Sequence, residues 1–177
     1  MSAAPITNVA TVRPILGLGC IAALLIANLA TAQLIGNEAE MDRLQGKAEE
    51  AMASDDPEGA AMAMGRAALM AKYLAKTNQN DGSALRLFHG AEILFRSQEH
   101  SYRAMALFRR AGGQLPASSG VCGSLSLAQS SLQQALTMLT PENCEPGVCT
   151  AKSFQLEQAA ADWRTVIDSL IADYQCR

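Results

Sequence analysis

Apolar residues recur at spacings of three and four in several segments of the chain, and no segment alternates apolar and polar residues for long enough to form a strand. Spacings of three and four place side chains on one face of an α-helix, whereas a strand needs a period of two. The pattern therefore restricts the fold to the all-α class. Each helix is expected to bury one apolar face against its neighbours.

The spacing predicts six helices. Asp56 followed by Pro57 is typical of a helix start, because Asp caps free backbone N–H groups and Pro is favoured in the first turn. The predicted helices cover about Glu38–Ala53, Pro57–Lys76, Ser83–Arg96, Glu99–Ala111, Ser124–Leu139 and Thr150–Tyr174. Short loops between them would give three antiparallel hairpins, at about residues 38–77, 83–112 and 123–176. A closed helical bundle is the alternative arrangement.

The chain begins with the features of a secretory signal peptide. An apolar run from Ile15 to Leu29 follows Arg13 and ends at Ala30-Thr31-Ala32, an A-x-A cleavage sequence. This combination predicts that residues 1–32 are removed on export and that Gln33 opens a single helical domain over residues 33–177. The form of the signal and the alanine-rich chain indicate a bacterial periplasm, with secretion from a eukaryotic cell as the alternative.

Two other interpretations of the start are an uncleaved anchor and a lipoprotein signal. An anchor is disfavoured because the apolar run is shorter than the roughly 20 residues that span a bilayer. Lipidation at Cys20 is disfavoured because apolar residues continue from Ile21 to Leu29, where a lipoprotein signal should already have ended. We therefore expect membrane contact only through the signal segment, if it stays uncleaved.

The charge of the exported part is uneven. Without Arg13 it carries 13 basic and 17 acidic residues, a net charge of −4. This balance gives no support for a nucleic-acid partner. Residues 83–113, however, carry five arginines against Glu92 and Glu99, while the segments on both sides are acidic.

Four cysteines remain after export, and their even number predicts two disulfides. Cys122 and Cys176 stand at the outer ends of the last two predicted helices, and Cys144 and Cys149 stand between those helices. If these two helices run antiparallel, the outer two cysteines lie close together and so do the inner two. We expect Cys122–Cys176 across the open end of the hairpin and Cys144–Cys149 within the loop. A zinc site is the competing interpretation, but both histidines lie far from these cysteines in the sequence.

One segment resembles the tetratricopeptide repeat over a full unit. The residues that carry the likeness are Phe88, Ala91, Phe95, Ala104, Phe108, Ala111 and Pro116, with Glu92 where that family has a small residue. A second match covers the first hairpin, with Leu44, Lys47, Ala48, Ala51, Ala60, Met64 and Ala67. The resemblance, over about half of the exported chain, implies a right-handed array of helical hairpins.

Patterns of catalytic residues are missing from the sequence. The two histidines fall on different predicted helices, and there is no glycine-rich phosphate loop, no H-E-x-x-H and no C-x-x-C-H. The paired acids Glu49-Glu50 and Asp55-Asp56 stand at a helix end and a cap, where acidic residues are ordinary. We therefore expect no catalytic residue, no cofactor and no metal ligand.

The resemblance also implies a binding surface. In tetratricopeptide-like folds the first helix of each pair lines a concave groove, which would place Arg86, His89, Ile93 and Arg96 on its wall. Because arginine forms paired hydrogen bonds with carboxylates, the expected ligand is an acidic peptide or a C-terminal carboxylate. The alternative is an ordinary solvated surface, or pairing with acidic side chains of the first predicted helix.

The sequence thus predicts an exported helical scaffold or adaptor that binds a protein partner in the periplasm. Two alternatives from other classes stay open. One is a helical bundle that binds a small ligand or a metal in its interior. The other is a structural subunit of an envelope complex.

Overall fold

The computed structural model describes residues 38–140 and 151–176, and in this part of the chain all regular structure is helical. Residues 38–53 form the first helix. Four further helices follow it: α2 (Pro57–Thr77), α3 (Gly82–Arg110), α4 (Ser119–Leu139) and α5 (Ala151–Asp173). The all-α class predicted from the apolar spacing is confirmed, but the described residues form five helices where six were predicted.

Side-chain caps fix the starts of the two long inner helices. The Asp56 carboxylate accepts a hydrogen bond from the Gly59 N–H at 2.9 Å, and Pro57 occupies the first turn of α2. Asp81 accepts from the N–H groups of Ser83 and Ala84 at 3.0 and 3.1 Å and so caps α3. These bonds satisfy donors that have no partner within the helix itself.

The predicted break between Arg96 and Glu99 is wrong, because α3 is one continuous helix of 29 residues. The predicted middle hairpin at residues 83–112 is therefore a single helix followed by a turn. Gly112 and Gly113 form that turn with φ angles of 72° and 70°, a conformation that favours glycine. Of the residues that carry the tetratricopeptide likeness, those from Phe88 to Phe108 lie on this one helix, and Ala111 and Pro116 lie beyond its end.

The break was expected because the apolar pattern pauses over five polar residues from Ser97 to Ser101. Four of the five are nevertheless buried. The Ser97 hydroxyl donates to the carbonyl oxygen of Ala128 on α4 at 2.7 Å, and the Ser101 hydroxyl donates to the Ser97 carbonyl oxygen at 3.0 Å. Hydrogen-bonded polar groups can be buried at modest cost, so the helix continues through them.

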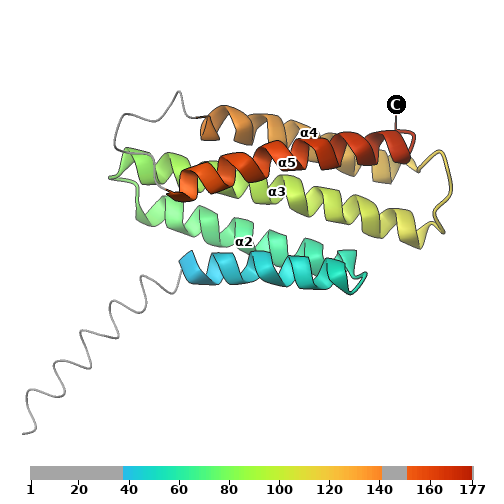
Figure 1. Cartoon of the computed structure of the whole chain (residues 1–177), viewed down its shortest axis with the longest axis horizontal. Coiled ribbons are helices and arrows are strands. Elements are labelled where there is room, and N and C mark those ends of the chain that lie inside the picture. Colours follow the sequence, from blue (N-terminus) through green and yellow to red (C-terminus); the bar gives the residue numbers. More distant parts are fainter. Residues whose placement is uncertain (1–37, 141–150, 177) are drawn as a thin grey trace, which may run out of the picture. The chain divides into compact units, whose positions relative to one another are not determined.

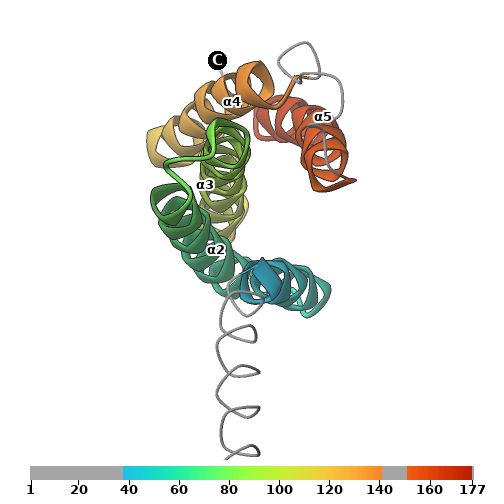
Figure 2. The same ribbon diagram turned by 90° about the vertical axis from the view of Figure 1, so that its left-hand side faces the viewer.

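The five helices follow one another around an arc. Figure 1 shows them running roughly along one direction, and the end-on view in Figure 2 shows α3 in the middle of the arc, between α2 and α4. The first helix and α5 stand at the two ends of the arc. An ion pair between Asp42 of the first helix and Lys152 of α5 links these two ends.

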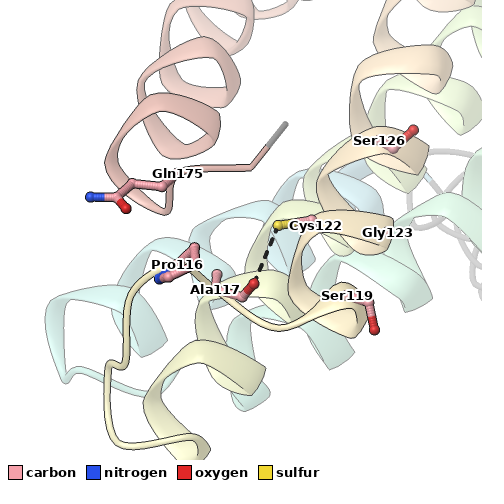
Figure 3. Close-up of a pocket in the computed structure, with 7 residues that line it drawn as sticks. All are labelled: Pro116, Ala117, Ser119, Cys122, Gly123, Ser126 and Gln175. Carbon is pink, nitrogen blue, oxygen red and sulfur yellow. Dashed lines mark hydrogen bonds between the residues drawn. The ribbon is translucent and has the colours of Figure 1, made fainter.

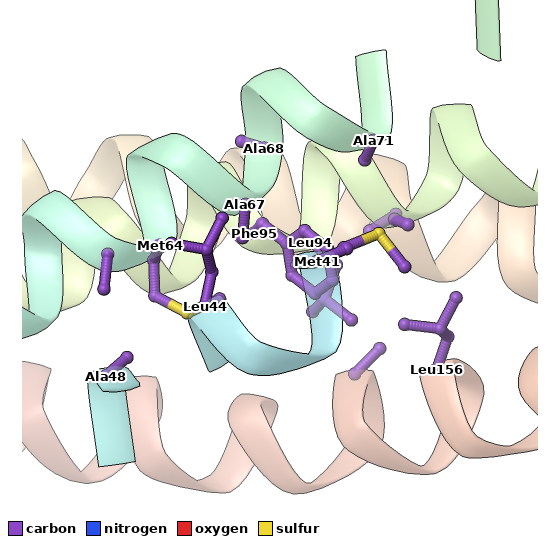
Figure 4. Close-up of a cluster of buried hydrophobic side chains, with 14 of the residues drawn as sticks. Met41, Leu44, Ala48, Met64, Ala67, Ala68, Ala71, Leu94, Phe95 and Leu156 are labelled. Carbon is purple, nitrogen blue, oxygen red and sulfur yellow. The ribbon is translucent and has the colours of Figure 1, made fainter. Parts of the chain in front are cut away.

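The inner side of the arc is filled by one apolar cluster to which all five helices contribute (Figure 4). Met41, Leu94, Phe95 and Leu156 belong to it, and each is at most 2% exposed. Alanine provides seven of the ten buried residues of α2, and these small side chains let α2 approach its neighbours closely. A core shared by the first and last helices corresponds to the bundle alternative more than to an open array, in which each repeat packs only on its neighbours.

A second, smaller cluster lies where α5 ends. A disulfide joins Cys122 to Cys176, with their Cα atoms 5.3 Å apart, as the sequence predicts. The Tyr174 ring stacks on Phe108 of α3 at a centroid distance of 4.0 Å, and the Tyr174 carbonyl oxygen accepts a hydrogen bond from the Ala117 N–H at 2.9 Å. The end of α5 is thus attached to α4 by the disulfide, to α3 by the stacked rings and to the segment before α4 by the hydrogen bond.

Several predictions lie outside the described residues. These are the signal peptide over residues 1–32, the mature start at Gln33 and the pairing of Cys144 with Cys149. Among the helices that the structure describes, none combines the length and apolar character needed to cross a bilayer.

Candidate functional site

The four residues predicted to bind a peptide share one stripe of α3. Arg86 and His89 are exposed, while Ile93 and Arg96 are partly buried. Ile93 packs against the main apolar cluster. The resemblance implied a concave groove at this place, but the inner side of the arc is occupied by the core. The exposed stripe of α3 therefore lies on the outer side of the arc.

Within this stripe, one carboxylate holds two guanidinium groups. Glu99 accepts a hydrogen bond from Arg96 Nη1 at 2.7 Å and a second from Arg103 Nη2. Only 5% of the Glu99 side chain is exposed, against 35% for Arg96 and 57% for Arg103. Since a guanidinium has five donors in a fixed fork, both arginines keep N–H groups for a further acceptor while Glu99 fixes their orientation.

Gly65 of α2 makes room for the buried carboxylate. A Cβ atom at this position would lie 3.0 Å from Glu99 Oε1 and 3.1 Å from its Cδ. Glycine in the middle of a helix costs about 1 kcal/mol relative to alanine. A glycine within the alanine-rich α2 is therefore explained by the side chain that lies over it.

A second acidic side chain is covered in the same way. Glu92 is 14% exposed, and its two carboxylate oxygens lie 3.8 Å from Lys72 Nζ of α2 and 3.9 Å from His89 Nδ1. The Glu92 contact crosses from α3 to α2, as does the packing of Glu99 against Gly65. The acidic partners of His89 and Arg96 thus come from α3 itself, whereas the alternative stated from the sequence placed such partners in the acidic flanks, for instance on the first helix.

His100 lies between Arg96 and Arg103 along α3. Burial lowers the pKa of His100; the Glu99 carboxylate opposes this effect, while the charges of Arg103 and Arg96 add to it. His100 therefore tends to be neutral near physiological pH, and the lasting positive charge of the stripe comes from its arginines.

Most exposed charges of α2 and α3 are positive; Glu58, in the first turn of α2, is partly exposed and pairs with Arg110. Between Gly59 and Arg110 the chain has eight lysines and arginines, and its acidic residues are Asp81, Glu92 and Glu99. Asp81 caps α3 at the connection of the two helices, and the other two carboxylates are covered. The outer face of the α2–α3 pair, defined by Arg96, Arg103 and the exposed side chains beside them, is therefore a basic surface.

Sequence reasoning missed Glu99 and Arg103 as members of this surface. Their spacing carried a signal, since an acid followed by arginine four positions later is a common ion pair on one helix face. The predicted helix break between Arg96 and Glu99 divided the three residues between two helices. Only a continuous helix brings Arg96, Glu99 and Arg103 onto one face.

A separate pocket of about 740 Å³ lies beside the disulfide (Figure 3). Pro116, Ala117, Ser119, Cys122, Gly123, Ser126 and Gln175 line it. Cys122 Sγ lies 3.9 Å from the Ala117 carbonyl oxygen at its wall. Among the described residues that line this pocket none is charged, and specific recognition usually requires placed polar or charged groups that fix a ligand's orientation. The outer face of α2 and α3 carries more definite chemistry.

Metal ligands are not gathered anywhere in the part of the chain that the structure describes, where no group of three or more His, Cys, Asp and Glu side chains is placed to hold an ion. Comparison of the chain with family models, with curated proteins and with solved structures finds no match. The resemblance to the tetratricopeptide repeat stays a prediction.

Proposed function

We propose that the protein is an exported helical interaction module that binds an acidic segment of a protein partner through the outer face of α2 and α3. Its working compartment would be the periplasm or another oxidising space, where the Cys122–Cys176 disulfide persists. The proposed ligand is a run of Asp and Glu side chains or a C-terminal carboxylate.

The observation that supports this proposal is the pair of arginines held by one buried carboxylate. Arg96 and Arg103 stand seven residues apart, which on a helix is two turns and about 10.5 Å. Glu99 neutralises one of their two charges and leaves a net positive site. Prior orientation lowers the entropy lost when a carboxylate binds, so such a pair is better suited to recognition than freely moving surface lysines.

The proposal is tested by capturing the protein through a C-terminal tag from the envelope fraction of its own host. The captured partners are compared between the native protein and an Arg96→Gln, Arg103→Gln variant. Arg164→Gln is the matched control, because Arg164 is an exposed arginine on α5. Circular dichroism of each purified variant checks that it is folded.

We expect defined partners with the native protein and the control, and loss of those partners with the double variant. An unchanged set of partners in the double variant would contradict binding through these arginines. Recovery of the protein in the cytoplasmic fraction would contradict its proposed compartment.

A further inference from the structure

A row of exposed apolar side chains runs along α2 beside the two arginines. Met62 is 71% exposed, Leu69 56% and Tyr73 51%. Their spacings of seven and four residues place them on one face of α2. Single exposed apolar residues are ordinary, but these three are aligned on one face and form an apolar strip, with the exposed Arg66 between Met62 and Leu69.

The strip and the arginines form two parallel rows. Three contacts set the antiparallel register of the helices: Glu58 with Arg110, Gly65 with Glu99, and Lys72 with Glu92. In this register Met62 lies level with Arg103, and Leu69 lies level with Arg96. Each of these pairs is separated from the next by two helical turns, about 10.5 Å.

Both rows face outward. The opposite sides of α2 and α3 carry Met64, Ala67 and Phe95, which are buried in the shared core. The face from Met62 to Tyr73 and from Arg96 to Arg103 therefore belongs to one outer surface, with the apolar strip and Arg66 along α2 and the two arginines along α3.

We infer that this surface binds an acidic amphipathic helix. The partner's apolar residues would cover Met62 and Leu69, and its carboxylates would meet Arg96 and Arg103. The repeat of about 10.5 Å equals seven residues of a partner helix, so its residues i and i+7 meet equivalent positions. An extended strand repeats on one face about every 6.7 Å, which does not match. Charge complementarity selects an acidic partner, since the exposed charges of this surface are positive.

This inference rests on the proposed function and adds the shape of the ligand. It is tested with a fluorescein-labelled synthetic helix that carries leucines at spacings of three and four, with glutamates on the flanking positions. Two further peptides serve as controls: a scrambled isomer of the same composition, and a version with lysine in place of glutamate. Binding to the purified, oxidised protein is followed by fluorescence anisotropy.

Three variants of the protein separate the two rows. Met62→Gln with Leu69→Gln removes the apolar row, and Arg96→Gln with Arg103→Gln removes the basic row. The matched control is Leu127→Gln with Arg164→Gln, because Leu127 on α4 is 54% exposed and thus similar to Leu69. The substituted apolar residues are exposed, so those variants are expected to fold. The arginine variant leaves the covered Glu99 carboxylate without its two partners, so circular dichroism checks that this variant is folded before its binding is compared.

We expect the acidic helix to bind, the two control peptides to bind at least about tenfold more weakly, and each row variant to weaken binding at least about tenfold. The matched control should bind as the native protein does. If the scrambled peptide binds equally well and only the arginine variant weakens it, the helical ligand is overturned while the proposed function stands. If no acidic peptide binds, both are overturned.

Two other occupants of the surface are tested with the same variants. The first is a membrane. If the protein sediments with vesicles of anionic lipid, if both row variants fail to do so, and if no peptide binds, the inference is overturned in favour of a membrane. Self-association seen by size-exclusion chromatography, and lost in both row variants, would overturn it in favour of a second copy of the chain.

Discussion

The α2–α3 pair and the α5 helix are held in the molecule by different means. Ten of the 21 residues of α2 are buried, most of them alanines in close contact with neighbouring helices. Only three of the 23 residues of α5 are buried: Leu156, Ala160 and Ile167. A disulfide, two aromatic contacts and one ion pair with the first helix supplement the packing of α5.

The two parts of the molecule therefore depend on different interactions for their stability. Burial of apolar surface stabilises α2 and α3 without help from a covalent link. The outer face of that pair can therefore keep its arginines and apolar strip in fixed positions. The α5 helix completes the core but depends on its attachment points, above all on the bond between Cys122 and Cys176.

The largest expected effect comes from removing that bond. Replacement of Cys122 and Cys176 by serine should lower the free energy of unfolding by about 3 to 4 kcal/mol, because the bond closes a long loop in the unfolded chain. Urea unfolding followed by circular dichroism measures the loss. The double variant of Cys144 and Cys149 is the control and should lose less. An equal or larger loss in the control would contradict the special role given to the end of α5.

Overpacking the α2–α3 pair should have the next largest effect. Ala67 is fully buried in the shared core, so Ala67→Leu should destabilise the protein by about 1 to 3 kcal/mol. Ala161→Leu on the exposed side of α5 is the control and should change little. If both variants unfold at the same urea concentration, the close approach of α2 is not what stabilises this half.

The contact between Gly65 of α2 and Glu99 of α3 can be tested by mutation. Gly65→Ala should gain about 1 kcal/mol of helix propensity only where the Glu99 side chain does not crowd it. We therefore expect Gly65→Ala to be neutral or destabilising in the native chain and stabilising by about 1 kcal/mol in a Glu99→Ala background. Unfolding of the four proteins in a double-mutant cycle measures the coupling. Equal effects in both backgrounds would show that Glu99 and Gly65 do not interact.

Tyr102 reports on the contact between α3 and α5. Its ring meets Trp163 edge-on at a centroid distance of 5.2 Å, and burial, with a smaller effect of the Glu49 charge, raises its pKa to about 12. A raised pKa means that the stabilising contribution is complete below pH 10 and is lost as the pH rises through about 12.

Ultraviolet absorbance of the phenolate follows this titration. In the native protein one tyrosine should ionise near pH 12, and in the Cys122→Ser, Cys176→Ser variant its pKa should fall toward the ordinary value. The variant Tyr102→Phe identifies the signal. If the cysteine variant leaves this pKa unchanged, the attachment of α5 at Trp163 does not depend on the disulfide.

Local sequence signals predicted the starts of α2 and α3 well, but they placed the start of α4 at Ser124 where the helix begins at Ser119, and they divided α3 in two. Asp56 with Pro57 marked the start of α2 because caps act within a few residues of their own position. The continuity of α3 could not be predicted from apolar spacing, since Ser97 is buried through a hydrogen bond to Ala128 of a helix about 30 residues away. Polar residues with distant partners are indistinguishable in sequence from residues of a loop.

The candidate site shows the same limit. The sequence identified the basic segment and Arg96, because charge and spacing are local properties. It did not identify Glu99 as the group that orients Arg96 and Arg103, nor Gly65 as the residue that makes space for it. Both roles depend on the register between α2 and α3, which only the packed structure defines.

Hydrogen exchange in the oxidised and the reduced protein tests most directly whether α2 and α3 depend less than α5 on the disulfide for their stability. Mass spectrometry of peptic fragments resolves the helices from one another. We expect reduction to lower the protection of the amides of α5 by a larger factor than the protection of those of α2 and α3. Equal loss of protection in all three helices would contradict the account, because the outer face would then depend on the disulfide as much as α5 does.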